Sequence, residues 1–355
     1  MRTLFCHFHG YLRSRIVRIH SLFWLFVVLT APQMVLGSDQ YGPENGLTDR
    51  MICQLNRLQV AAETDTVGEI RAYCDDIAER VNESTETNPE ENRNLVKTRL
   101  LLERSASENR FAILQHRPNY VLPLSYNRTP NNAPFSEVAP DRELDRAEFK
   151  FQISLKLALT DNTVDSRLRG YAAYTNQSYW QVFDTDNSSP FRETVHEPEF
   201  FLDFDSDINL GNWRVPLLRL GAVHQSNGRS GSLSRSWNRI YAQMFAEKRN
   251  YAITFKPWVR LSDSSDDNPD IEDFIGNFEL GLFRKGNRSN SAVRLRHNLE
   301  SPARMGVQLD YTLPIPGHDS LRFYLQYFYG YGESLIDYNA RSNRFSLGIQ
   351  TGDLL

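Results

Sequence analysis

From about residue 110 onward, apolar and polar positions alternate along the chain with a period of two. The clearest run is residues 149–160, where one face carries Phe149, Phe151, Ile153, Leu155, Leu157 and Leu159. The other face carries Lys150, Gln152, Ser154, Lys156 and Thr160, and residues 305–312 and 321–329 repeat this division. Successive side chains of a β-strand point to opposite faces, so this pattern predicts strands with one apolar face each.

Such segments lie between turn residues near positions 118, 155, 174, 201, 219, 241, 255, 279, 293, 309, 325 and 347, which makes about twelve strands. Each has roughly the ten residues that a tilted strand needs to cross a bilayer, and an even number is typical of outer-membrane barrels. A soluble β-sandwich would alternate as well. Aromatic residues near the segment ends, as in FYLQYFYGYG at 323–332, favour the barrel. We therefore predict an all-β fold, a twelve-stranded antiparallel transmembrane β-barrel over residues 109–355.

Residues 38–108 have a helical pattern, with apolar positions three and four apart in 47–63 and 67–81. The polar run Asn82–Asn94 interrupts this pattern and is expected to be a linker. We predict a small helical extension in the periplasm. Its two cysteines, Cys53 and Cys74, are expected either to form a disulfide or to stay reduced and buried.

The first residues are typical of a targeting segment, because several arginines precede an apolar run that ends near Gly37. We expect a signal peptide over residues 1–37; the alternative is an uncleaved anchor, but Pro32 and Gln33 interrupt the run. The formal net charge of -4 gives no electrostatic reason to expect a nucleic-acid partner. Mean hydropathy is low, at -0.50, which an alternating barrel strand also produces.

Polar side chains interrupt the apolar face of the strand predicted near residue 219. Leu218, Leu220 and Ala222 share their parity with His224 and Ser226, so both polar residues fall on the lipid-facing side. On the next predicted strand, Asn238 shares its parity with Ile240, Ala242, Met244 and Ala246. If the two strands form a hairpin, these three polar side chains converge on the outer surface.

Polar groups that face hydrocarbon are costly unless they bond one another, so the cluster is a functional hypothesis. Its composition suits nucleophilic acyl transfer, with Ser226 as nucleophile, His224 as base and Asn238 orienting the imidazole. The alternative is that the three residues simply lie above the hydrocarbon, at the level of the lipid headgroups. An enzyme that cleaves lipid esters would also act near that level.

Six short motifs follow one another in the barrel region: NSSPFRET from Asn187, HQSNGRS from His224, SRSWNRIY from Ser234, KPW from Lys256, DDNPDI from Asp266 and GYGESLIDYN from Gly330. Their sequence and order resemble the outer-membrane phospholipase A family of Gram-negative bacteria, from about residue 110 to the chain end. This resemblance implies a twelve-stranded barrel in the outer membrane that hydrolyses phospholipid acyl esters with A1 and A2, and lysophospholipase, activity. It also implies the roles given above for Ser226, His224 and Asn238.

The resemblance further implies a calcium-dependent enzyme that is active as a homodimer. The calcium positions match Arg229, through its carbonyl oxygen, Ser234, and Ser188 of the second subunit, with a further position at Asp267. Hard oxygen ligands of this kind suit calcium. The segment around Asp267 is equally typical of a solvated turn, because Asp, Asn and Pro favour turns without an ion.

Two other functions are compatible with this chain. The first is a non-catalytic barrel, either a pore or a structural protein, which would have the same fold but no hydrolase activity. Its predicted lumen carries Lys150, Lys156, Arg219, Glu279, Arg322 and Gln326, and in so small a barrel we expect opposite charges to close the lumen. A secreted soluble esterase would stay in solution without detergent after removal of the signal peptide.

Overall fold

A computed structural model describes residues 53–54, 66–86, 95–107, 112–141, 143–160, 167–262, 266–286, 288–300, 304–352 and 354–355. The predicted signal peptide and most of the predicted helix 47–63 lie outside these residues. Within them, no helix has the length and apolar character needed to cross a membrane.

Helix α4 (Val67–Glu86) begins with a reciprocal cap. The Thr66 amide and hydroxyl both donate to Glu69 at 2.8 Å, and the Glu69 amide donates back to the Thr66 hydroxyl at 3.3 Å. These bonds, the one from the backbone amide first, hold the pKa of Glu69 below its ordinary value. The linker predicted to start at Asn82 was placed too early, because helical residues continue through the polar run to Glu86.

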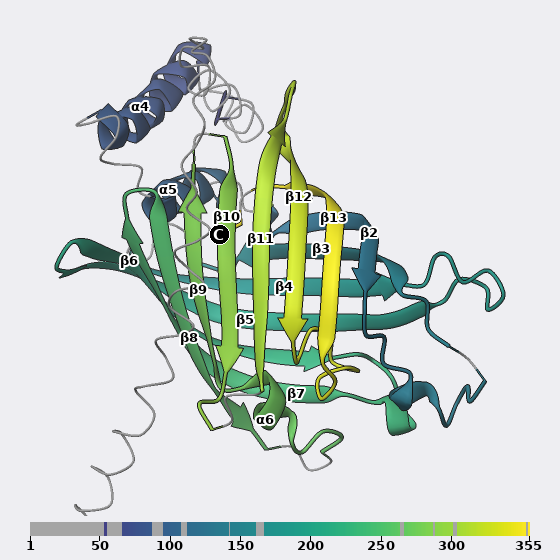
Figure 1. The fold of residues 1–355 in the computed structure, drawn as a ribbon. Helices are drawn as coiled ribbons and strands as arrows, with labels where there is room; N and C mark the ends of the chain where they lie inside the picture. Colours follow the sequence, from purple (N-terminus) through teal and green to yellow (C-terminus); the bar gives the residue numbers. More distant parts are fainter. Residues whose placement is uncertain are drawn as a thin grey trace, which may run out of the picture. The chain divides into compact units, whose positions relative to one another are not determined.

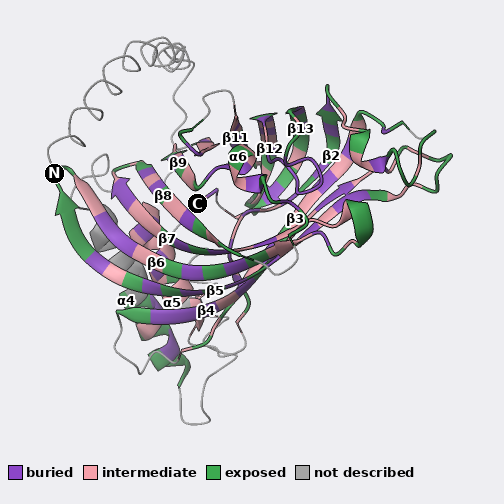
Figure 2. Ribbon diagram, turned by 90° about the horizontal axis from the view of Figure 1, so that it is seen from below, coloured by how far each residue is buried: buried purple, intermediate pink, exposed green. Residues whose placement is uncertain are grey.

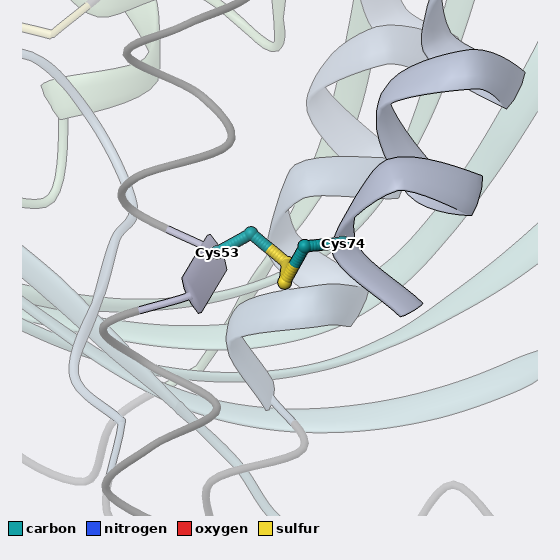
Figure 3. The surroundings of a disulfide bond; sticks show 2 residues. All are labelled: Cys53 and Cys74. Atoms are coloured by element: carbon teal, nitrogen blue, oxygen red, sulfur yellow. A yellow bond between two sulfur atoms is a disulfide. The ribbon is translucent and has the colours of Figure 1, made fainter. Parts of the chain in front are cut away.

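Cys53 and Cys74 form a disulfide, with their Cα atoms 5.8 Å apart (Figure 3). Of the two alternatives left open by the sequence, the structure has the disulfide. Cys74 lies on α4 and is buried together with Ile70, so the bond ties residue 53 to the apolar face of this helix.

Strands β2 to β13 form the closed antiparallel barrel that the sequence predicts (Figure 1). Each strand pairs with the next along the chain, and β13 pairs with β2 to close the circle. The two-residue β1 (Leu114–Gln115) pairs with the same edge of β3 as β2 does, so β1 and β2 act as one interrupted strand. The twelve strands are β2 (Asn119–Asn127), β3 (Ala147–Ala158), β4 (Leu168–Trp180), β5 (Phe191–Leu210), β6 (Trp213–Ser226), β7 (Ser236–Lys248), β8 (Tyr251–Leu261), β9 (Phe278–Lys285), β10 (Asn290–His297), β11 (Met305–Ile315), β12 (His318–Gly330) and β13 (Ser342–Thr351). Short helical turns η3 (Ala133–Phe135), η4 (Gly231–Leu233) and α6 (Ile271–Ile275) lie in the connections.

The predicted alternation of faces is present in the structure (Figure 2). On β3, Ile153 and Leu157 are exposed on the outer face, whereas Lys150 and Lys156 are almost completely buried inside. An outward apolar face and an inward polar face are the reverse of a soluble globular core.

Ion pairs and hydrogen bonds fill the barrel interior. Lys150 donates to Gln326 at 2.7 Å and pairs with Glu333 at 3.1 Å, and Arg219 pairs with Asp203 at 2.6 Å. Arg344 joins this network through Glu148 and Glu333. The opposite charges therefore bond one another inside the barrel, as expected for a small barrel.

Helix α5 (Leu95–Ser107) belongs to the predicted extension but contacts the inner wall of the barrel. Its first turn is capped by Glu247 of β7, which accepts from the Val96 amide at 2.7 Å. Near its end, Glu103 pairs with Lys156 of β3 at 2.8 Å, and Arg104 pairs with Asp205 of β5. The helix therefore adds to the lumenal filling, while the domain boundary at residue 108 stays a prediction.

Loss of the ion pair between α5 and β3 should make the folded protein measurably less stable. Glu103→Leu should lower the free energy of unfolding by about 3–5 kcal/mol, because it leaves the Lys156 ammonium buried without its carboxylate. The double variant Glu103→Leu with Lys156→Met should recover most of this loss, since an apolar pair replaces the ion pair. Urea unfolding of the refolded protein in detergent measures both values. Equal stability of wild type and the single variant would contradict the importance of this pair.

Candidate active site

His224 and Asn238 face each other on neighbouring strands. They are register partners on β6 and β7, and His224 Nδ1 lies 2.8 Å from Asn238 Oδ1. An amide oxygen only accepts, so the imidazole proton lies on Nδ1 and the Nε2 lone pair is left available as a base. The structure thus brings together two of the three predicted catalytic residues, with the ring exposed on the outer surface.

Ser226 ends β6, two residues beyond His224 on the same outward face. Residues two apart on a strand are about 6.6 Å apart at their Cα atoms, so the hydroxyl and the imidazole are neighbours on this face. The Ser226 hydroxyl oxygen accepts a hydrogen bond from the Gly228 amide at 3.1 Å. Gly228 has φ +63°, a conformation that favours glycine and that turns its amide back toward the strand end.

Asn227 holds the loop that follows Ser226. Its side chain is buried and accepts from the Arg235 amide at 3.0 Å, while its own amide group donates to Leu233 O at 2.8 Å. The Asn227 backbone amide also donates to Arg235 O at 3.0 Å. These bonds close the β6–β7 loop across its base and fix the direction of the Gly228 amide.

The β6–β7 loop, which follows Ser226, also brings two side-chain oxygen atoms together. The Ser234 hydroxyl donates to the Asp267 carboxylate at 2.5 Å, although 33 residues separate them in sequence. Arg229 lies in the same loop and turns its guanidinium to the backbone carbonyls of Phe191 and Arg192. Ser188 lies in the β4–β5 loop, in the left-handed region with φ +59°.

Of the four predicted calcium positions, Ser234 and Asp267 are therefore in direct contact. The turn alternative for the segment around Asp267 is also present, because Asp266 accepts from the Asn268 amide at 3.1 Å just before α6. Within the described parts of the chain, no group of three or more His, Cys, Asp or Glu residues is arranged to hold a metal ion. Any cation here would need hydroxyl and carbonyl oxygens as well as the carboxylate.

His196, which the sequence pattern did not single out, lies beside Ser226. His196 on β5 is the register partner of Ser226, and Tyr174 Oη lies 2.6 Å from its Nδ1. Parity would have placed it on the outer face, because it shares that face with the exposed Phe200 and Leu202. Its proximity to Ser226 depends on strand register, which the sequence pattern does not give.

Gln225, between the two catalytic candidates, points into the lumen as its parity predicts. It accepts hydrogen bonds from Trp237 Nε1 at 2.7 Å and from Arg239 at 3.1 Å. These bonds join β6 to β7 on the inner face, directly behind the His224–Asn238 pair. The inner network thus supports the position of the outer cluster.

Comparisons with known proteins identify the family of this chain. The model of the family described as phospholipase A1 matches residues 96–351. A phospholipase A1 of Proteus vulgaris is 36% identical over 248 residues, which are 70% of this chain and 84% of the relative. A phospholipase A1 of Escherichia coli K12 is 35% identical over 250 residues, with 70% and 84% covered.

Solved structures give the same result. Outer membrane phospholipase A from Escherichia coli superposes with a TM-score of 0.65 at 33% identity, covering 69% of this chain and 100% of that one. A Salmonella typhi outer membrane phospholipase, crystallised as a dimer with bound calcium, superposes with a TM-score of 0.66 at 32% identity, covering 70% and 94%. The chain belongs to the phospholipase A1 family of carboxylic ester hydrolases, and its closed twelve-stranded barrel is that of an outer-membrane phospholipase of Gram-negative bacteria.

Proposed function

We propose that this protein is a calcium-dependent phospholipase with A1, A2 and lysophospholipase activity, which acts through Ser226, His224 and Asn238. The observation that carries the proposal is the 2.8 Å contact between His224 and Asn238 beside an outward-facing Ser226. The phospholipid substrate would reach these residues laterally from the membrane, because all three lie on the outer face of the barrel.

In the first half of the reaction, the Ser226 oxygen attacks the ester carbonyl carbon while its proton passes to His224 Nε2. The tetrahedral intermediate then expels the glycerol oxygen, which takes the proton back from His224. In the second half, water attacks the carbonyl carbon of the acyl-serine and gives a proton to His224. The bond to the Ser226 oxygen then breaks, this oxygen takes the proton back from His224, and the fatty acid is released. Asn238 accepts from Nδ1 throughout and keeps Nε2 directed to the reacting oxygen.

The Gly228 amide supports this chemistry. It donates to the resting Ser226 oxygen at 3.1 Å, so it lies near the place where negative charge develops on the substrate oxygen. A backbone amide fixed by the Asn227 bonds would stabilise that charge without reorganisation.

The residues present fit a calcium ion, since the Ser234 hydroxyl and the Asp267 carboxylate converge within 2.5 Å in the loop next to Ser226. Ser234, the Arg229 carbonyl and Ser188 of a second subunit would hold the ion in a dimer, and Asp267 would contribute in the monomer. A bound calcium would supply electrostatic stabilisation to the developing oxyanion. The related Salmonella typhi protein, a dimer with bound calcium, supports both the ion and the homodimer.

The paired charges inside the barrel argue against the alternative of a pore. Lys150, Glu333 and Arg344 are engaged in ion pairs inside the barrel, and α5 adds Glu103 and Arg104 to the filling. A structural barrel without activity would also have no need for outward-facing His, Ser and Asn residues.

The nucleophile can be tested against a matched serine. Ser226→Ala should abolish phospholipid hydrolysis by the refolded protein, because the attacking oxygen is removed. Ser236→Ala is the control, since Ser236 is the register partner of Ser226 on the neighbouring strand and has no role in the mechanism. Release of fatty acid from mixed micelles measures both. A folded Ser226→Ala variant with wild-type activity would disprove the mechanism.

Asn238 has a smaller expected effect than Ser226. Asn238→Ala should lower kcat about fivefold, because a neutral hydrogen bond that orients the imidazole contributes about 1 kcal/mol. KM should change little, since Asn238 contacts His224 and not the lipid in this proposal. Steady-state kinetics with a single phospholipid separates the two constants, and a rise in KM with unchanged kcat would argue against an orienting role.

Calcium dependence is tested by chelation. Removal of calcium should abolish activity, and Ser234→Ala should raise the calcium concentration needed for half-maximal activity at least about tenfold, as expected for loss of an oxygen ligand. Ser232→Ala, in the same loop, serves as the control. Calcium titration of fatty acid release measures the shift. Full activity in chelator would refute the metal assignment while leaving the nucleophile untouched.

A further inference from the structure

A row of polar side chains extends the candidate active site across four strands. Asn176 on β4 is the register partner of His196 on β5, which pairs in turn with Ser226 on β6, which pairs with Ser236 on β7. The mechanism proposed above uses only Ser226 from this row. His196 is half-buried, carries an imidazole and has no role in that mechanism.

The contacts of His196 determine which ring nitrogen carries its proton. Tyr174 Oη lies 2.6 Å from Nδ1, and the Asn176 amide nitrogen approaches the same atom at 3.5 Å. The Asn176 oxygen accepts from the Ser178 hydroxyl at 3.1 Å, which fixes the amide with its NH2 group toward the ring. An amide NH2 group only donates, and the tyrosine hydroxyl can donate, so Nδ1 is the acceptor and Nε2 carries the hydrogen.

The Nε2 side of this ring faces the loop that carries the oxyanion donor. A Cβ atom placed on Gly228 would lie 3.9 Å from His196 Nε2 and 3.8 Å from Cδ2. Gly228 is the residue whose amide bonds the Ser226 oxygen at 3.1 Å. The Nε2–H donor therefore lies next to the nucleophile, on the loop side of Ser226, whereas His224 lies on the opposite side, farther along the strand.

The distribution of apolar residues on the outer surface indicates how a bound lipid would be oriented. From His224 toward the middle of β6 and β7, the outward residues are apolar and exposed, including Leu220 and Ile240, which suits an acyl chain. With the ester carbonyl at Ser226, the rest of the molecule must continue toward the loop end of the strands. Only the glycerol carbons separate the ester from the phosphodiester, so a lipid in this orientation would bring its phosphate to the Nε2 side of His196.

We propose that His196 Nε2–H donates a hydrogen bond to a phosphodiester oxygen of the bound phospholipid, with Tyr174 and Asn176 holding the ring in place. His196 is then a specificity-determining residue, which favours phosphate-bearing esters over neutral esters of the same acyl chains. The inference rests on the proposed function, because it takes the ester position from Ser226. Hydrogen bonds to an anionic acceptor are about twice as strong as neutral ones, which makes the phosphate a better partner than a neutral headgroup.

The test compares two substrates and two variants of the full-length protein. The substrates are a diacyl phosphatidylglycerol and the diacylglycerol with the same acyl chains, each in the same detergent micelles with calcium. His196→Leu should raise KM for the phospholipid about tenfold, as expected for loss of one hydrogen bond to a charged group, and should leave diacylglycerol hydrolysis unchanged. His196→Gln, which retains a side-chain N–H donor, should restore most of the phospholipid KM.

The variant Tyr174→Phe tests the same inference independently, in case His196→Leu fails to fold. It removes the donor to Nδ1 and should weaken phospholipid binding in the same direction, again without an effect on diacylglycerol. An equal loss on both substrates would overturn the inference, because it would indicate a structural role. So would an unchanged KM for both. Wild-type protein that hydrolyses neither substrate would instead reject the proposed function itself.

Discussion

The pairing of β13 with β2 is the constraint on which the rest of the structure depends. Within a bilayer, backbone amides and carbonyls have no water to bond, so a sheet must close on itself to satisfy every strand edge. Closure divides all side chains into two sets, one facing lipid and one facing a narrow lumen. The charges of the alternating strands can then lie only inside, where Lys150, Arg344 and their acidic partners bond one another.

Register, which closure fixes, also assembles the candidate active site. His224 meets Asn238, and Ser226 meets His196, because β5, β6 and β7 pair at particular positions. A slip of one residue would turn these side chains into the lumen and bring Gln225 to the lipid. The lumenal bonds of Gln225 to Trp237 and Arg239 oppose such a slip. The inner network therefore stabilises the geometry of groups that it never touches.

Periodicity was sufficient to predict what depends on single strands. The alternation predicted the twelve strands, and parity predicted that His224, Ser226 and Asn238 share the outer face. Periodicity does not predict which residues of different strands or loops lie side by side. The position of His196 beside Ser226 and the contact between Ser234 and Asp267 therefore became known only from the structure. Helix α5 was not predicted as a separate element of the extension. Its place inside the barrel depends on contacts such as the Glu103–Lys156 ion pair, which the sequence pattern does not give.

Because charged side chains lie on the inner face, the proposed catalytic residues on the outer face are of types that need no permanent charge. None of the three proposed catalytic side chains is a carboxylate, and Asn238 orients the imidazole without placing one against lipid. An unpaired carboxylate there would be costly to desolvate, whereas Glu193 and Glu197 on the inner face of β5 have cationic partners. In the proposed mechanism, negative charge appears on the outer face only during turnover, when it develops on the substrate oxygen. This charge would develop close to the Gly228 amide and the oxygens of the β6–β7 loop. These groups are already in position in the resting protein, so they could stabilise the charge without a charged group from the lumen and without movement of the strands.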